Sequence, residues 1–145
     1  MWQIIQIEHV LLMRLPMNKG DKLKFNCIID EAVYKGFITV FKDNNPLHTN
    51  TEYAISKGFK ERVMHGNILN GFLSYFIGEC LPTKDVIIHS QQISFNHPVY
   101  MNDKLQFEAE VEEIYDSVEV VKFKFYFKNS EGKNVAKGNI QIGLT

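Results

Sequence analysis

Residues 67–81 read NILNGFLSYFIGECL, a pattern that predicts one long helix with apolar side chains around most of its circumference. The small or polar residues of this stretch fall in one narrow stripe, formed by Asn67, Asn70, Gly71, Ser74 and Gly78. A helix with so little polar surface has to be covered by other parts of the chain. The segments on either side of it therefore have to supply the cover.

The sequence after this helix alternates between apolar and polar residues, which is typical of strands with one buried face. The predicted strands are Lys22–Ile29, Val86–Phe95, Leu105–Val111, Val121–Phe127 and Ala136–Leu144. We therefore expect an α+β fold, in which an antiparallel sheet wraps around one long central helix.

Two shorter helices are predicted before the central one, at Glu31–Thr39 and at Thr51–Lys57, the second with Asn50 or Thr49 as its N-cap. The chain has 145 residues and contains no repeat, low-complexity tract or Pro/Gly-rich linker, so we expect a single domain over residues 17–145. Residues 1–16 are predicted to be an N-terminal extension, whose apolar content favours packing on this domain or on a partner subunit.

Composition excludes several classes of protein. With 16 Lys and Arg against 17 Asp and Glu, the formal net charge is -1, which argues against a general electrostatic grip on nucleic acid or an anionic membrane. Cys27 and Cys80 stand far apart, so we expect neither a disulfide scaffold nor a cysteine zinc site, and we expect a cytoplasmic location. The apolar stretch within residues 1–15 is interrupted by Glu8 and His9. We therefore expect neither a secretory signal nor a transmembrane helix there.

The first candidate for chemistry is the segment 43–48, which reads DNNPLH. Pro46 breaks helices, so this segment is predicted to be a structured loop between the two short helices. The carboxylate of Asp43 and the imidazole of His48 can converge on one water, because one group can take a proton while the other gives one. The alternative is that Asp43 stabilises a turn and His48 caps the next helix.

The second candidate is the segment 63–66, VMHG, directly before the central helix. Gly66 lets the backbone approach a ligand closely, and a free N–H at a helix start can polarise a carbonyl and hold the negative charge that it gains. The alternative is an ordinary glycine at a helix N-terminus.

Taken in order, these residues resemble the hydratase-2 motif of the MaoC-like hydratases, the (R)-specific enoyl-CoA hydratases of the hot-dog fold. The resemblance extends through most of residues 17–144. It is carried by Gly20–Phe25, Asp43–His48, Tyr53-Ala54, Gly58-Phe59, Val63–Gly66, Ser90–Phe95 and Pro98–Leu105.

The resemblance implies a role for each candidate residue. Asp43 and His48 are expected to be a catalytic dyad that holds and activates a water, and the backbone N–H of Gly66 is expected to bind the thioester oxygen. Asn45, His65 and Asn67 are candidate substrate contacts, although His65 also suits a structural role that braces the loop through hydrogen bonds. His48 is the better candidate for the base, because the ordinary pKa of histidine lies near neutrality.

The reaction implied is syn addition of water to a trans-2-enoyl thioester, or the reverse dehydration. No metal or other cofactor is expected, and the substrate is expected to be carried on coenzyme A or on an acyl carrier protein. An open sheet leaves exposed pairing groups at its edges, and hot-dog proteins solve this by pairing two sheets, so we expect a homodimer with one dyad in each chain.

The sequence also departs from the family pattern. Phe41-Lys42 stands where the family often has Ser-Gly, and Asn67 and Asn70 stand at the helix start where smaller or apolar residues are more usual. These departures keep open a pathway-specific dehydratase that acts on a carrier protein or an unusual substrate. The same fold and pocket would also suit a hot-dog thioesterase, or a non-catalytic module that binds acyl thioesters.

Overall fold

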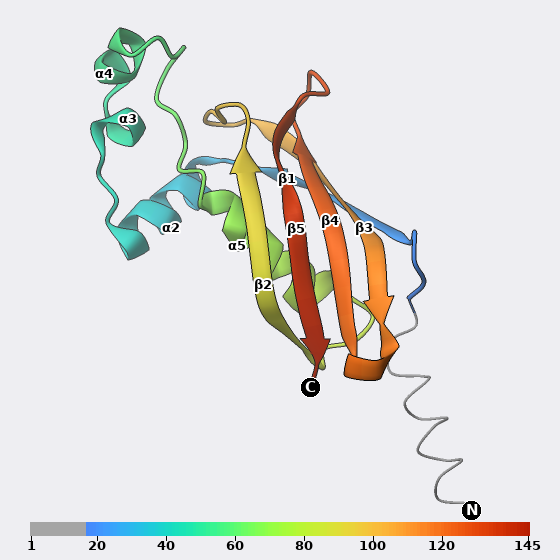
Figure 1. Ribbon diagram of the computed structural model, residues 1–145. Helices are drawn as coiled ribbons and strands as arrows, with labels where there is room; N and C mark the ends of the chain where they lie inside the picture. The colour runs from blue at the N-terminus through green and yellow to red at the C-terminus, as the bar shows by residue number, and fades with distance from the viewer. Residues whose placement is uncertain (1–16) are drawn as a thin grey trace, which may run out of the picture.

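The computed structural model describes residues 17–145 (Figure 1), and the predicted N-terminal extension lies outside the described residues. One sheet of five strands runs in the order β1-β3-β4-β5-β2, and all of its neighbouring strands are antiparallel. The strands are β1 (Lys22–Ile28), β2 (Val86–Phe95), β3 (Lys104–Tyr115), β4 (Val120–Lys128) and β5 (Asn134–Leu144). The predicted strands are thus confirmed, and a short 3-10 helix η2 (Asp116–Val118) joins β3 to β4.

The alternating side chains of the central strands form the core. Phe123, Phe125 and Phe127 of β4 are completely buried, whereas the residues between them are partly exposed. On the neighbouring strand, Phe107 stands opposite Phe127 in the register of the β3–β4 pair. Burial of one face of the sheet is what the period of two predicts.

The central helix lies against this buried face (Figure 1). It consists of α5 (Ile68–Tyr75) and continues directly as the π-helix η1 (Phe76–Cys80), so the one long helix predicted over 67–81 is confirmed, although its π-helical end was not predicted. Five of its apolar side chains are buried, whereas Tyr75 is 49% exposed, and Asn70 of the predicted polar stripe is hydrogen-bonded to Gln91 of β2. The buried set is Ile68, Leu69, Leu73, Phe76 and Ile77.

Three further helices form a lobe that projects beyond the sheet (Figure 1). They are α2 (Glu31–Phe41), α3 (Pro46–Thr49) and α4 (Thr51–Ser56), and α2 is two residues longer than predicted. The carboxylate of Asp30 caps α2 by accepting the N–H of Val33 at 2.9 Å. Asn50 caps α4, as predicted, by accepting the N–H of Tyr53 at 3.0 Å.

Within residues 17–145, no helix combines the length and the apolar character that a membrane crossing requires.

Candidate active site

The site begins where α2 ends. Lys42 follows the last turn in the left-handed conformation, with φ of 57°, and its N–H donates to Ile38 at 2.9 Å. This cap turns the chain away from the helix axis. Asp43 is therefore carried out of α2, and its Oδ1 accepts the N–H of Asn45 at 3.2 Å.

His48 lies on the one-turn helix α3, so the prediction of a structured loop over residues 43–48 is wrong for residues 46–48. Pro46 occupies the first turn, where its missing N–H costs nothing, and the side chain of Asn45 caps the turn by accepting the N–H of Leu47 at 3.0 Å. The proline thus ends the preceding segment, as expected, and then starts a new helical turn.

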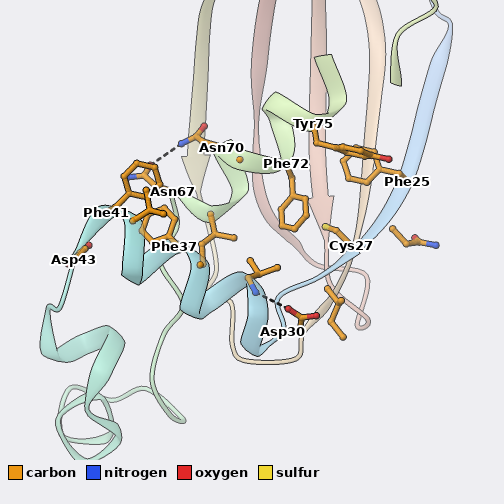
Figure 2. A pocket seen from close by; sticks show the side chains of 17 residues that line it. Phe25, Cys27, Asp30, Phe37, Phe41, Asp43, Asn67, Asn70, Phe72 and Tyr75 are labelled. Atoms are coloured by element: carbon orange, nitrogen blue, oxygen red, sulfur yellow. Dashed lines mark hydrogen bonds between the residues drawn. The ribbon is translucent and has the colours of Figure 1, made fainter. Parts of the chain in front are cut away.

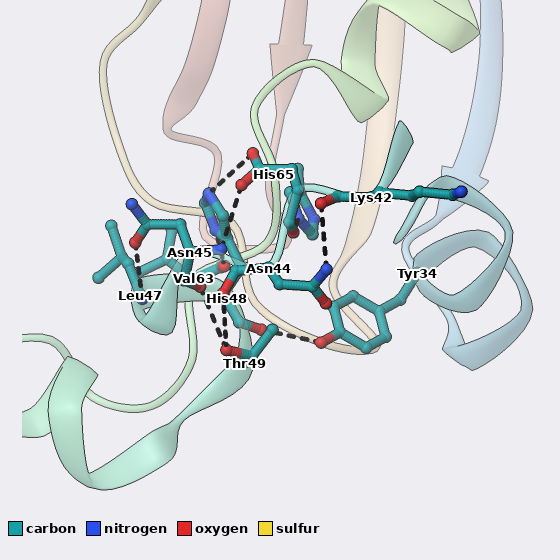
Figure 3. Close-up of polar contacts among 10 residues, drawn as sticks. Tyr34, Lys42, Asn44, Asn45, Leu47, His48, Thr49, Val63 and His65 are labelled. Atoms are coloured by element: carbon teal, nitrogen blue, oxygen red, sulfur yellow. Dashed lines mark hydrogen bonds and ion pairs between the residues drawn. The ribbon is translucent and has the colours of Figure 1, made fainter. Parts of the chain in front are cut away.

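Two contacts hold the backbone and the ring of His48 (Figure 3). Its carbonyl accepts the hydroxyl of Tyr34 at 2.9 Å, and its Nδ1 lies 2.7 Å from the carbonyl oxygen of Val63. Because a carbonyl can only accept, Nδ1 carries the proton and Nε2 is left with a lone pair.

Asp43 and His48 meet, as the motif predicts. Oδ2 of Asp43 lies 3.8 Å from Nε2 of His48, and the side chains are 50% and 16% exposed, respectively. The turn-stabilising role considered for Asp43 is also present, through Asn45. His48 does not cap α4, because Asn50 does so.

His65 is buried beneath this pair. Its Nε2 lies 2.9 Å from the backbone oxygen of Asp43, and its ring centroid lies 4.0 Å from that of His48. Burial lowers the pKa of His65, and the neighbouring His48 lowers it further, against the opposing effects of the Asp43 carbonyl and carboxylate. The hydrogen-bonding role expected for His65 is therefore present in the structure.

Gly66 and Asn67 present backbone N–H groups at the start of α5. Within the described chain neither N–H donates a hydrogen bond. A Cβ added at Gly66 would lie 3.0 Å from the ring of Phe95, so a side chain here would push that ring aside. The side chain of Asn67 accepts the amide of Asn70 at 2.9 Å, and Asn70 in turn accepts Gln91 at 2.7 Å.

Two clefts adjoin at this point. The larger has a volume of about 1050 Å³, lies between β1, α2 and α5 (Figure 2), and is mostly apolar away from Asp43. The smaller, of about 420 Å³, contains His48, His65 and Gly66. Asn67 borders both clefts, whereas Asn45 lines neither of the two.

The sequence did not predict the residues of α2 and β1 that contact the site. Tyr34 of α2 anchors His48, and Cys27 of β1 lines the larger cleft, where burial raises the pKa of its thiol to about 11. The only signal in the sequence is the position of Tyr34 on the inward face of a predicted helix.

The residues that could hold a metal are Asp43, His48 and His65, which each offer one ligand atom within 4.8 Å of the others. One nitrogen of each ring already faces a backbone oxygen. A metal ion binds in the plane of an imidazole at about 2.1 Å, but these two rings lie against each other with centroids 4.0 Å apart and 32° between their planes. This arrangement suits proton transfer better than coordination, and the absence of a metal stays a prediction.

Comparison with protein families finds one match that spans most of the chain. A family model described as "MaoC like domain" matches residues 16–132. Among characterised relatives, the chain is 32% identical over 92 residues to the (R)-specific enoyl-CoA hydratase of Aeromonas caviae. That match covers 63% of this chain and 69% of the relative.

Other relatives extend the comparison. The 3-hydroxybutyryl-CoA dehydratase of Methylorubrum extorquens is 32% identical over 79 residues, which cover 54% of this chain and 50% of that enzyme. The solved structure of the R-hydratase PhaJ1 from Pseudomonas aeruginosa superposes with a TM-score of 0.80 at 31% identity, over 88% of this chain and 82% of that one. These likenesses confirm the predicted hot-dog fold.

Proposed function

Because this chain belongs to the MaoC-like domain family, whose hydratases and dehydratases it resembles, we propose that it hydrates trans-2-enoyl thioesters to (R)-3-hydroxyacyl thioesters, or catalyses the reverse dehydration. The observation that carries the proposal is the meeting of Asp43 and His48 at 3.8 Å, beside a helix start at which the N–H of Gly66 is unused within the described chain.

In the hydration direction, Asp43 and the lone pair on Nε2 of His48 hold one water. His48 takes a proton from this water, the water oxygen bonds to Cβ of the substrate, and negative charge moves onto the thioester oxygen. The N–H of Gly66 stabilises that charge. A proton that the dyad relays through Asp43 to Cα completes the addition, so one water is consumed and both side chains regain their starting protonation states.

The two clefts support a placement for the substrate. The acyl tail occupies the larger, apolar cleft that starts at Asp43 and is walled by Phe37 and Phe72. The carrier arm leaves through the smaller cleft, past His97. Asn67 stands between the two, where its side-chain amide can contact the thioester. Burial of the tail against aromatic side chains favours binding by the hydrophobic effect.

We also propose that the chain forms a homodimer. β2 is an edge strand with exposed large apolar residues, including Ile87 at 54% exposure and Phe95 at 50%. Pairing of β2 with a second copy would cover this edge. We place the dimer in the cytoplasm, since Cys27 and Cys80 are both free thiols.

The test is the loss of enoyl-thioester absorbance when the purified protein meets crotonyl-CoA and hexenoyl-CoA, with His48→Ala and the exposed-site control Lys133→Ala alongside. Loss that requires His48 and yields a 3-hydroxyacyl product supports the proposal. Release of free thiol indicates a thioesterase instead. Binding without turnover indicates an acyl-binding module, and turnover only with an acyl carrier protein indicates a carrier-specific dehydratase.

A further inference from the structure

His65 is an unusual residue for the interior of this protein. Tyrosine aside, it is the one polar or charged residue that is buried within residues 17–145, with 3% of its surface exposed. Its Nδ1 has no hydrogen-bonding partner and is shielded from solvent. A buried polar atom without a partner costs free energy, so this position calls for a reason beyond packing.

The contacts of His65 reach every group that the proposed reaction uses. Nε2 meets the backbone oxygen of Asp43 at 2.9 Å, and the ring stacks against His48 at 4.0 Å (Figure 3). The next residue in the chain is Gly66. The ring of His65 also lies against that of Phe37, with ring centroids 4.7 Å apart. A small displacement of His65 therefore moves the carboxylate, the base and the N–H together.

The hydrogen bonds also fix where protons reside. The carbonyl oxygen of Asp43 can only accept, so the proton of His65 is on Nε2 and the lone pair on its Nδ1 is buried. A second proton on His65 would have no acceptor. On His48, by contrast, the free Nε2 faces the carboxylate of Asp43, which stabilises a proton placed there.

We propose that His65 is a positioning residue for the Asp43/His48 pair: its Nε2–H fixes the backbone of Asp43, its ring supports the imidazole of His48, and the lack of an acceptor at its Nδ1 directs the transferred proton to His48. This inference rests on the proposed function. It goes beyond it by giving His65 two separable tasks, a hydrogen bond and a stacked wall.

The groups that face His65 agree with a neutral ring. They are His48 from α3, Asp43 from the preceding loop, and Tyr34 from α2, whose ring carries the guanidinium of Arg62 at 5.2 Å. Burial lowers the pKa of His65 below the usual range. Because the unfolded chain takes up this proton more readily, the stability contributed by a neutral His65 is complete above about pH 6.5 and falls as the pH decreases.

Two variants separate the tasks. His65→Gln keeps an N–H in the position of Nε2 but removes the ring, so the imidazole of His48 becomes more solvated. We therefore expect the acid limb of the pH profile of kcat/KM to move to higher pH, with kcat changed only a few-fold. His65→Phe keeps the ring but loses the bond to Asp43. We expect its kcat to fall about 10- to 100-fold, the cost of a misplaced catalytic group, with the acid limb in place. The exposed-site control is Lys133→Gln, in the turn between β4 and β5.

The positioning role is overturned if both variants keep the wild-type kcat and acid limb, or if both lose activity only in proportion to unfolded protein, as a purely structural role requires. Nitrogen NMR of the histidine side chains provides a readout without substrate. We expect His65 to be neutral and protonated on Nε2 at pH 7, and a charged His65 at this pH or a proton on Nδ1 overturns the assignment. If the wild-type protein turns over no enoyl thioester, the proposed function fails, whereas the NMR result still decides the tautomer on which this inference depends.

Discussion

Oδ2 of Asp43 and Nε2 of His48 are 3.8 Å apart, which is too long for a direct hydrogen bond but lets one water oxygen bond to both. The two residues differ in exposure, since Asp43 is half exposed and His48 is mostly buried. They are held by different contacts, Asp43 through Asn45 and His48 through Tyr34 and Val63. The pair is therefore set up to exchange protons through a shared water oxygen rather than through a direct hydrogen bond.

Replacement of the carboxylate should abolish this cooperation and leave the fold intact. Asp43→Asn keeps the oxygen that accepts the N–H of Asn45 but removes the charge, and we expect kcat for crotonyl-CoA to fall at least about 10²-fold. Because Asp43 is half exposed, the melting temperature should stay within a few degrees of wild type. Wild-type turnover in Asp43→Asn would show that the carboxylate takes no part in the chemistry.

The hydroxyl of Tyr34 should matter more for the site than an equivalent hydroxyl elsewhere. Tyr34→Phe removes its bond to the carbonyl of His48 at 2.9 Å and the longer bond that Arg62 donates to it at 3.5 Å. We expect the unfolding free energy to fall by about 1 kcal/mol, with a larger effect on kcat than on KM. Denaturant unfolding and steady-state kinetics measure both. The matched control is Tyr126→Phe, whose hydroxyl lies on β4 and has no hydrogen bond to another described residue. Equal effects in the two variants would contradict the anchoring role.

The strands and the central helix could be predicted because their signals are repeated. The alternation along β4 is repeated at Phe123, Phe125 and Phe127, and each of these residues indicates the same buried face of the sheet. The one-turn helix α3 was missed because so short an element has no periodicity, and because Pro46 signals an end and a beginning equally well.

The candidate site could be predicted as a set of residues but not as an arrangement. The spacing of Asp43 and His48 shows that they can meet, whereas the contact of His65 with both depends on how the segment before α5 is threaded. That path is set by long-range backbone bonds, such as the N–H of Met64 to the carbonyl of Val99 at 2.8 Å. No local pattern encodes it.

Lys42 departs from the family pattern, and its backbone conformation predicts how a glycine at this position would change the stability of the fold. Its φ of 57° places a side chain in the left-handed region, which costs a residue other than glycine about 1 kcal/mol. Lys42→Gly should therefore raise the unfolding free energy by about 1 kcal/mol. Lys35→Gly, in the middle of α2, should lower it by about the same amount. A loss of stability in both variants would show that the Lys42 side chain stabilises the fold by another route.

The larger cleft allows a test of where the acyl tail of the substrate binds, because two glycines that line it face open space. Gly36 of α2 and Gly71 of α5 both line it, and a Cβ added at either would meet nothing within 4 Å.

If the acyl tail lies in this cleft, the side chain of Gly71→Leu should fill the space that a longer acyl chain needs. We expect kcat/KM for octenoyl-CoA to fall about 10-fold or more relative to kcat/KM for crotonyl-CoA, because overpacking by a few carbons costs about 1–3 kcal/mol. Gly36→Leu should change the selectivity in the same direction from the other wall. Gly71→Ala is the matched control, and it should improve the helix without altering selectivity. Equal loss with both substrates would place the acyl tail elsewhere.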